Sequence, residues 1–312
     1  MLLLCACLAE PAAHPVDGDA VIARLAKRSL LLDVHGRGER ALAVGERGHV
    51  LLSTDGGKNW QQVAAPTRRT LTGVFLVDDQ TAWAVGHQSV ILKSGDGGET
   101  WTKANVENDP EIAYLDVLFL DVKTGFIVGS YGKFLLTSDG GNNWTEAKQD
   151  DDPHFSHIIA TPDGSLWLTG EFGTVRRSTD RAKRWEPLAM PYEGTFFGAL
   201  PLDKGGAVVF GLRGNIFRSG DGGEWLKIES PTKALLHGGL ALADRRLVLS
   251  AGAGQLLVSA DEGRSFRLAT MPGAESATAT SLWQAADGGV LLTSDKGVHR
   301  LELADLKTEA GK

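Results

Sequence analysis

The sequence is poor in cysteine and tyrosine and has no long apolar run. Its two cysteines, Cys5 and Cys7, both lie among the first seven residues, so disulfides and thiol chemistry are excluded for the rest of the chain. No apolar run approaches the roughly 18 residues that a transmembrane helix requires. The net charge is −7, and a field of this sign does not favour nucleic acid or anionic lipid as a partner.

Glycine is abundant instead, with 39 in 312 residues, which indicates many tight turns. The glycines follow no Gly-X-Y period, and this excludes collagen. Hydrophobic residues make up 42% and charged residues 23%, the balance of a globular chain rather than a disordered one. The length fits two ordinary domains or one large all-β or α/β-barrel domain.

The two ends of the chain differ from the rest. Residues 1–9 form a short apolar run, and a segment with small residues and two prolines follows it. We expect residues 1–14 to be an export signal and the protein to act in the periplasm or an equivalent compartment. The run lacks a basic start, so a frayed apolar tail is the alternative, and residues 4–7 fit a lipoprotein anchor poorly. We expect residues 305–312 to be a disordered tail.

A repeat of about 41 residues runs along the chain. Each unit contains Ser or Thr, an aspartate two residues later, one or two glycines in most copies, and then a large aromatic residue. The aspartates step by 41, 43, 41, 41 and 40 residues. They are Asp55, Asp96, Asp139, Asp180, Asp221 and Asp261, and the aromatic residues are Trp60, Trp101, Trp144, Trp185, Trp225 and Phe266.

Two further columns are in register with the aspartates. A glycine, or alanine in the sixth unit, stands ten residues before each aspartate, and a second small residue follows three positions later. Each unit then divides into four short segments rich in β-branched and aromatic residues, bounded by turn residues. Four strands per unit of this length predict the blades of a β-propeller. WD40 repeats are disfavoured, because no Trp-Asp pair ends a strand.

The blade count follows from the end of the chain. After Phe266 the sequence offers three further strands, at about 278–285, 289–293 and 298–303, and no fourth. We therefore predict an all-β fold over residues 15–304, a seven-bladed β-propeller of four-stranded blades. The last blade would be closed by an N-terminal strand around residues 17–25, which would remove exposed sheet edges.

The repeated aspartates are interpreted as structural. An aspartate can accept hydrogen bonds from the N–H groups of its own turn, and the aromatic residue can fill the space between blades. An acid that occurs in six copies is a device of the fold, whereas a catalytic acid is needed once. A calcium loop is the alternative, but its alternating oxygen ligands and distal glutamate are missing.

These residues resemble the Asp-box, or BNR, repeat of sialidase-type propellers. The whole register is similar more specifically to the photosystem II stability and assembly factor family and its bacterial relatives, over about residues 17–303. The segments that carry this likeness are residues 43–51, 82–87, 125–132 and 210–214. The resemblance implies an exported seven-bladed propeller without enzymatic activity, which binds proteins during the assembly or stabilisation of a membrane complex.

The loops between second and third strands should share one face with the connections between blades. Aromatic residues and arginines beside carboxylates are typical of a protein-binding surface. The candidate partner-binding residues on this face are Glu46, Arg47, His87, Tyr131, Lys133, Glu171, Phe172, Arg213, Asp152, His154, Tyr192, Glu193 and Phe196. The expected partner is a subunit of a membrane complex or its precursor, bound by a monomer without a cofactor.

Three other functions have weaker support in the sequence. A basic stretch at residues 176–184 could dock an acidic partner or lipid head groups, but an ordinary charged edge explains it as well. His154 and His157 lack a third ligand nearby, so no metal site is predicted. A sialidase-like glycosidase or carbohydrate-binding propeller is the alternative function. The sequence lacks the Arg-Ile-Pro segment expected of a sialidase. A sialidase also needs a tyrosine nucleophile with a glutamate partner, and Tyr192 and Glu193 are adjacent, which rarely lets their side chains face each other.

Overall fold

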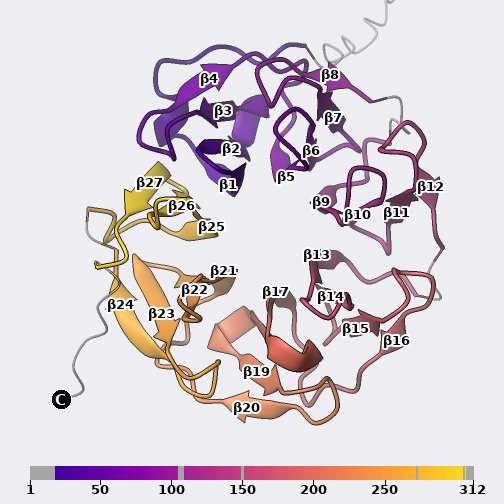
Figure 1. Cartoon of the computed structure of the whole chain (residues 1–312), viewed down its shortest axis with the longest axis vertical. Coiled ribbons are helices and arrows are strands. Elements are labelled where there is room, and N and C mark those ends of the chain that lie inside the picture. The colour runs from indigo at the N-terminus through magenta and orange to yellow at the C-terminus, as the bar shows by residue number, and fades with distance from the viewer. Residues whose placement is uncertain (1–17, 105–108, 149–150, 272, 305, 307–312) are drawn as a thin grey trace, which may run out of the picture.

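Seven antiparallel sheets surround a central axis in the computed structural model (Figure 1). It describes residues 18–104, 109–148, 151–271, 273–304 and 306. The prediction of an all-β, seven-bladed propeller is confirmed, and the only helices in the described part are 3-10 turns. The predicted export signal at residues 1–14 lies outside the described residues. Of the predicted tail at 305–312 only Leu306 is described, and it is buried.

Blades 1 to 6 each have four strands, which follow one another from the axis outward (Figure 1). Blade 1 comprises β1 (Leu31–Arg37), β2 (Arg40–Gly45), β3 (Val50–Ser53) and β4 (Gln61–Val63). Blade 2 comprises β5 (Leu71–Leu76), β6 (Ala82–Gly86), β7 (Ile91–Ser94) and β8 (Thr102–Lys103). Blade 3 comprises β9 (Tyr114–Phe119), β10 (Gly125–Gly129), β11 (Phe134–Thr137) and β12 (Thr145–Glu146).

Blades 4 to 6 repeat this order. Blade 4 comprises β13 (Phe155–Ala160), β14 (Leu166–Gly170), β15 (Val175–Ser178) and β16 (Glu186–Pro187). Blade 5 comprises β17 (Phe196–Pro201), β18 (Ala207–Gly211), β19 (Ile216–Ser219) and β20 (Leu226–Ile228). Blade 6 comprises β21 (Leu236–Ala241), β22 (Leu247–Ala251), β23 (Gln255–Ser259) and β24 (Arg267–Thr270). Four short turns are 3-10 helical: η1 (Ala26–Arg28), η2 (Glu46–Gly48), η3 (Asp203–Gly205) and η4 (Leu212–Gly214).

Blade 7 differs from the prediction. It has three strands in the described part of the chain, β25 (Ala279–Gln284), β26 (Val290–Ser294) and β27 (Gly297–Leu301). The predicted N-terminal strand is wrong for residues 18–25, which form no strand. These residues run along blade 1, where the Ala20 N–H donates to the Ala65 carbonyl at 2.8 Å and the Ala23 N–H donates to Gln62 Oε1 at 2.7 Å.

The core lies between neighbouring blades. The second strand of each blade is buried along its length, because residues on both of its faces meet apolar side chains. One cluster, for example, joins Leu42, Val44 and Val50 of blade 1 to Leu71 and Val74 of blade 2. Packing between sheets therefore stabilises the ring, and each core cluster of the described residues joins two neighbouring blades.

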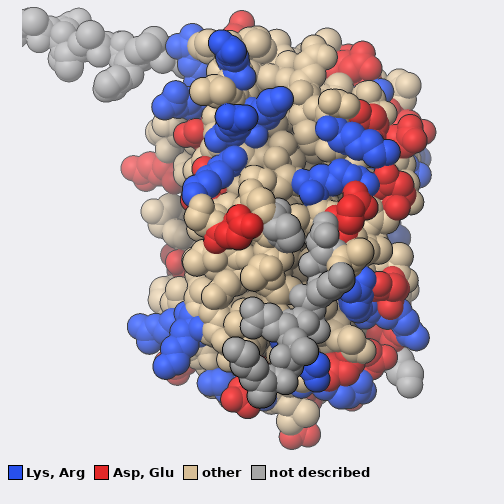
Figure 2. Space-filling model, turned by 90° about the vertical axis from the view of Figure 1, so that its left-hand side faces the viewer, with Lys and Arg blue, Asp and Glu red and all other residues tan. Residues whose placement is uncertain are grey.

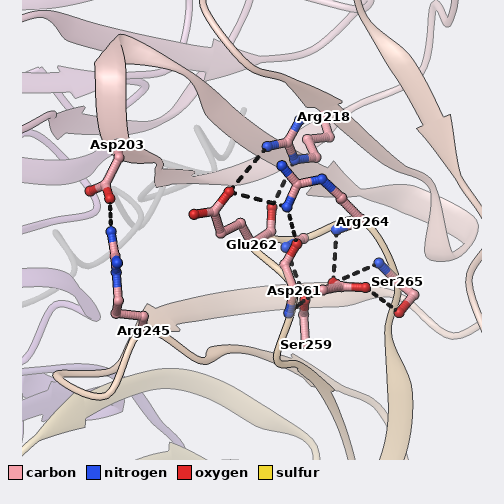
Figure 3. A network of polar contacts seen from close by, with 9 residues as sticks. Asp203, Arg218, Arg245, Ser259, Asp261, Glu262, Arg264 and Ser265 are labelled. Atoms are coloured by element: carbon pink, nitrogen blue, oxygen red, sulfur yellow. Dashed lines mark hydrogen bonds and ion pairs between the residues drawn. The ribbon is translucent and has the colours of Figure 1, made fainter.

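The aspartate turns are closed by hydrogen bonds of their own residues, as in blade 6 (Figure 3). The Ser259 hydroxyl donates to Asp261 Oδ1 at 2.7 Å, and the Ser265 hydroxyl donates to Oδ2 at 2.6 Å. The Arg264 N–H donates to the same carboxylate at 3.0 Å. Hydrogen bonds donated to a carboxylate favour its charged form. In the equivalent turn of blade 1, hydrogen bonds from Asn59 hold the pKa of Asp55 at about 2.

The aromatic residue after each turn packs against the preceding blade. Trp144 of blade 3 meets Trp83 of blade 2 edge-on at 5.5 Å between ring centroids, and Trp225 of blade 5 meets Trp167 of blade 4 at 5.7 Å. Both Trp83 and Trp167 are fully buried. The motif thus contributes its stabilisation across the interface between two blades.

A cation that was not predicted from the sequence also links successive blades. Lys93, Arg177, Arg218 and Arg300 occupy equivalent positions on the third strands of blades 2, 4, 5 and 7. Each donates to a backbone carbonyl in the aspartate turn of the next blade, at 2.6–3.2 Å. The bond from Arg300 to the Gly56 carbonyl joins blade 7 to blade 1 and helps to close the ring.

The aspartate turns offer a test of this packing. Gly141 has φ +75°, and a Cβ there would lie 2.2 Å from the buried Trp83 ring. Gly38 has φ +59° with no heavy atom within 4 Å of such a Cβ. We expect Gly38→Ala to cost about 1 kcal/mol for the left-handed backbone alone. Gly141→Ala should cost about 3 kcal/mol, because overpacking is added. Urea unfolding measures both, and equal costs would contradict the packing argument.

Candidate functional site

The candidate site lies on the face that carries the loops between second and third strands. These loops bond to the connections between blades: the Ser130 N–H donates to the Ala113 carbonyl at 2.8 Å, and the Glu171 N–H donates to the His154 carbonyl at 3.1 Å. The aspartate turns bond instead to the loops between first and second strands, as Gly97 does to Gln80. The two sets of loops therefore lie on opposite faces of the propeller.

Each of these loops in blades 1 to 5 holds a large side chain at its tip in left-handed backbone. The tips are Arg47, Gln88, Tyr131, Phe172 and Arg213, with φ between 54° and 58°. Such a conformation costs about 1 kcal/mol for a residue other than glycine. Tyr131 and Phe172 are 56% and 77% exposed despite their apolar rings. The fold itself does not require aromatic side chains at these positions.

Blades 3 and 4 bring several predicted site residues together. The rings of Tyr131 and His154 meet edge-on with centroids 4.8 Å apart, and His154 Nδ1 lies 3.7 Å from the Glu171 carboxylate. Phe172 is the next residue along the chain. This group of aromatic rings, an imidazole and a carboxylate is named the blade 3–4 cluster.

The same face extends toward blade 5 and toward the connection after blade 3. The Gly132 N–H donates to the Pro153 carbonyl at 2.9 Å, so the Tyr131 loop runs beside Asp152. The Gly173 N–H donates to the Gly194 carbonyl at 2.9 Å, which places the Phe172 loop beside Glu193. Asp152 and Glu193 thus flank the cluster with negative charge.

Other predicted site residues stand apart or are occupied. Among the described residues, no hydrogen bond, ion pair or ring contact joins Glu46, Arg47, His87 or Arg213 to the blade 3–4 cluster. The Lys133 ammonium is paired with the Glu146 carboxylate at 2.8 Å, and its side chain is only 15% exposed.

Two aromatic residues of the blade 5 connection require a correction. Phe196 is fully buried, so its prediction as a partner-binding residue is wrong. Its side chain belongs to the core face of β17, because side chains alternate along a strand. Tyr192 is partly buried, since its ring packs on Phe196 and Phe217 with centroids 5.6 Å and 6.0 Å apart.

The basic stretch at residues 176–184 is largely neutralised within the fold. Arg176 is nearly buried, forms an ion pair with Asp151 and lies over the Phe155 ring at 5.1 Å. Arg177 is 3.3 Å from the Asp163 carboxylate, and Arg181 is 2.6 Å from the Asp121 carboxylate. These arginines pair with side chains of the chain itself, which weakens the case for a docking patch here.

A polar cavity of about 150 Å³ lies on the propeller axis. The first strand of every blade has an irregular register at the same level, and the residues of these bulges line the cavity. Two acids stand there: Asp33 accepts a bond from the Val74 N–H at 2.8 Å, and Asp116 accepts one from the Ile158 N–H at 2.9 Å. Each therefore links its own blade to the next.

The environment of these acids shifts their protonation. Burial raises the pKa of Asp116 to about 7. Burial and the nearby charge of Asp116 raise the pKa of Asp33 to about 6. The imidazole of His157 lies 3.5 Å from the Asp116 carboxylate, and burial lowers its pKa to about 4. This site was not predicted from the sequence, although Asp33 and Asp116 occupy the same position of the repeat.

The described residues contain no group of three or more His, Cys, Asp and Glu side chains that could hold a metal ion. A search of the same residues for helices long and apolar enough to cross a membrane finds none.

The geometry also bears on the sialidase alternative. A tyrosine nucleophile needs a carboxylate partner and a free hydroxyl. The Tyr114 side chain is buried, and the Tyr192 hydroxyl lies 3.4 Å from the Leu212 carbonyl. Tyr131 contacts an imidazole and lies on an exposed tip.

Comparison with known proteins gives consistent results. The family model described as photosynthesis system II assembly factor YCF48 matches residues 21–110 and 105–229. No curated protein sequence matches this chain.

Solved structures share the fold at low sequence identity. One, titled YCF48 bound to D1 peptide, is 18% identical with a TM-score of 0.73, covering 90% of this chain and 95% of the other. YCF48 from Cyanidioschyzon merolae is also 18% identical with a TM-score of 0.73, covering 91% and 99%. A streptogramin B lyase is 15% identical with a TM-score of 0.77, covering 88% and 93%.

Proposed function

The chain belongs to the family of the photosynthesis system II assembly factor YCF48, and from that premise we propose that it is a non-enzymatic protein-binding scaffold. It would hold a segment of a membrane-complex subunit, or of its precursor, while that complex is assembled or stabilised. The structure of a YCF48 with a D1 peptide supports a peptide as the kind of ligand.

The observation that carries the proposal is the ring of strained, exposed loop tips. A left-handed tip is normally filled by glycine, asparagine or aspartate, yet blades 3 and 4 carry Tyr131 and Phe172 there. Large exposed aromatic side chains on rigid loops supply contact area at low entropic cost. Arg47 and Arg213 add charge to the same face. Such a surface favours binding of a polypeptide over catalysis.

The similarity to a lyase does not change this proposal. At 15% identity it concerns the shared propeller alone. We further propose that the protein is exported to the periplasm or an equivalent compartment, which rests on the sequence of residues 1–14 alone. Carbohydrate processing through this face remains the competing function to be tested.

Removing the tip side chains should abolish partner binding. We expect the variant Arg47→Ala/Tyr131→Ala/Phe172→Ala/Arg213→Ala to lose about 100-fold or more in affinity, because hot-spot residues carry most binding energy. The measurement is capture of a membrane-protein subunit from solubilised native membranes, with mass spectrometric identification, followed by titration of the peptide that it contributes. The tips are solvent-exposed loop positions, so the melting temperature should change little.

A matched control removes exposed side chains elsewhere. Leu226 and Val122 are 53% and 59% exposed, and the Arg264 side chain is 60% exposed. The variant Val122→Ala/Leu226→Ala/Arg264→Ala should bind as the wild type does. Unchanged binding by the tip variant would overturn the assignment of this face. Turnover of fluorogenic glycosides by the wild type would overturn the scaffold function itself.

A further inference from the structure

The outer edge of β27 has no neighbouring strand among the described residues, unlike the third strand of every other blade. In blades 1 to 6 that edge is covered by β4, β8, β12, β16, β20 or β24. A free edge presents unpaired N–H and C=O groups that can pair with another chain. Blade 7 is therefore one strand short within a ring of otherwise complete blades.

The strand register identifies the backbone groups that point outward. In blade 2 the Ile91 carbonyl accepts a bond at 2.9 Å from the Ala104 N–H, just after the fourth strand. Phe134 and Val175 accept the equivalent bonds in blades 3 and 4. The residue at this register in blade 7 is Val298, opposite Thr293 as Ile91 is opposite Val85. No backbone donor within the described part of the chain reaches the Val298 carbonyl.

The described ends of the chain pass this edge by. Before η1, the N-terminal segment follows blade 1, and the Arg68 guanidinium donates to the Asp19 carbonyl at 2.9 Å. After β27 the chain turns toward blade 6, where Leu306 joins a core cluster with Val258 and Ala269. Within the described chain, η1 approaches β27 near its first residue, where a Cβ on Gly297 would lie 2.0 Å from the Lys27 carbonyl.

A groove of about 430 Å³ lies along the edge. It extends from Lys296, in the loop before β27, to Lys58 in the aspartate turn of blade 1, and so spans the rim between the two faces. η1 forms another part of its wall with Lys27 and Arg28. Figure 2 views the side of the propeller on which β27 lies, and Lys and Arg side chains gather in its upper half.

The charge of the groove is one-sided. Five Lys and Arg residues and His299 line it, and no carboxylate does. Arg300 and Lys58 pair with Asp287 at its margin, at 2.9 Å and 3.1 Å. Lys27 and Arg28 have no ion pair within the described residues, so their charge is available to a ligand.

We infer that the edge of β27 is a second binding surface, which takes an extended acidic segment of a partner protein as the fourth strand of blade 7. Main-chain bonds to β27 would supply the ladder, and carboxylates would meet Lys27, Arg28 and Lys296. A lipid surface is disfavoured because head groups cannot pair with a strand edge. The existing fourth strands have only two to four residues, so a short segment suffices.

The inference can be tested with designed peptides on the full chain. The probe is a fluorescein-labelled seven-residue peptide in which glutamate alternates with valine. Its controls are the same peptide with lysine for glutamate, and the acidic peptide N-methylated at alternate residues. Fluorescence anisotropy should show about tenfold weaker binding of both controls, which lack either the charge or the ladder.

A charge-reversal variant locates the site. Lys27→Glu/Arg28→Glu should bind the acidic peptide about tenfold more weakly. Lys227→Glu/Arg267→Glu makes the same change on the exposed fourth strands β20 and β24 and should bind as the wild type does. Hydrogen exchange should slow at the amides of Val298 and Arg300 on peptide binding, and not in β24.

Three results would overturn the inference: no preference for the acidic peptide, binding without protection of β27, or equal binding by the Lys27→Glu/Arg28→Glu variant. A chain that binds only after removal of residues 1–17 would show that its own N-terminal segment occupies the groove, which also excludes a partner there. The surface is separate from the loop tips, so capture of a membrane-protein subunit tests the proposed function independently.

Discussion

The Asp116→Asn substitution should change the free energy of unfolding more favourably at pH 8 than at pH 4. The difference between its effects at these two pH values should be about 3 kcal/mol. In the folded protein the pKa of Asp116 is raised from 3.8 to about 7, chiefly by burial. As pH rises through this interval, the unfolded chain has lost the proton that the folded chain retains. Stability falls accordingly, and asparagine, which does not titrate, removes the fall.

Two features set the size of this effect. The Asp116 side chain keeps 14% exposure at the axial cavity, so water screens part of the full shift. Its two oxygens accept bonds from the Val117 and Ile158 N–H groups at 2.8 Å and 2.9 Å, and an amide can accept only one of them. The lost bond costs about 1 kcal/mol at every pH, so the change between pH 4 and pH 8 carries the prediction.

The free energy of unfolding must be compared between variant and wild type at each pH, because the titration of nearby groups changes stability with pH in the opposite direction. Burial lowers the pKa of His35 and His157 to about 4, and the stability that depends on their neutral forms is lost as pH falls from 6.5 toward 4. Asp33 shares the cavity, and its raised pKa should fall in the variant because the charge of Asp116 is gone. This coupling adds to the stabilisation at pH 8.

Asp55→Asn is the control of opposite sign. Hydrogen bonds from Asn59 hold the Asp55 pKa near 2, so its contribution is present above pH 4 and is lost as pH falls through 2. This variant should be less stable than the wild type at pH 8 and approach it in acid. Urea unfolding at several pH values measures both. An Asp116→Asn effect that does not change between pH 4 and pH 8 would contradict a raised pKa.

The architecture was accessible from the sequence because the repeat encodes it in several independent columns. The aspartate turn, the upstream glycine and the apolar residues of the second strand recur in register, and each repeat folds by packing on its neighbours. The bonds of Asp261 and the packing of Trp225 follow directly from residue types at fixed spacing. Seven blades then follow from six complete units and one short one.

The course of residues 18–25 could not be predicted from the sequence. The prediction of a strand there rested on the missing fourth strand of blade 7 and not on a residue pattern in this segment. Residues 18–25 bond to blade 1 instead, where the Gln62 side chain accepts from the Ala23 N–H and donates to the Val21 carbonyl. Ring closure instead uses long-range contacts between blades 7 and 1. The Ser281 hydroxyl donates to Asp33 at 2.7 Å, and Arg300 donates to the Gly56 carbonyl at 2.6 Å. No local signal in the sequence reports such bonds.

The candidate site divides in the same way. Loop tips could be located from the repeat, so the exposure of Tyr131 and Phe172 agrees with their placement in loops. Phe196 was misplaced because the sequence does not show where a connection ends and β17 begins. The axial acids were missed because a bulge shifts the alternation of side chains, and only coordinates reveal it.

Trp167→Ala should be among the most destabilising single changes in the molecule, at about 4 kcal/mol. The side chain is fully buried between blades 4 and 5, where Trp225 meets it edge-on and the Arg177 guanidinium lies over the ring at 5.4 Å. Truncation would open a cavity at the interface that holds two sheets together. It would also remove the surface on which the motif tryptophan of the next blade rests.

Trp60→Ala is a comparison at a less buried tryptophan, because Trp60 is the motif tryptophan of blade 1, equivalent to Trp225, but borders the groove beside β27 and is only partly buried. We expect about 2 kcal/mol there, since less apolar area leaves contact with the protein. A double-mutant cycle of Trp167→Ala with Trp225→Ala should give a coupling of about 1 kcal/mol, typical of an aromatic pair. Equal losses for Trp60 and Trp167 in urea unfolding would contradict the dependence of the cost on burial. Additive effects of Trp167 and Trp225 would show that the motif tryptophan does not act across the blade interface.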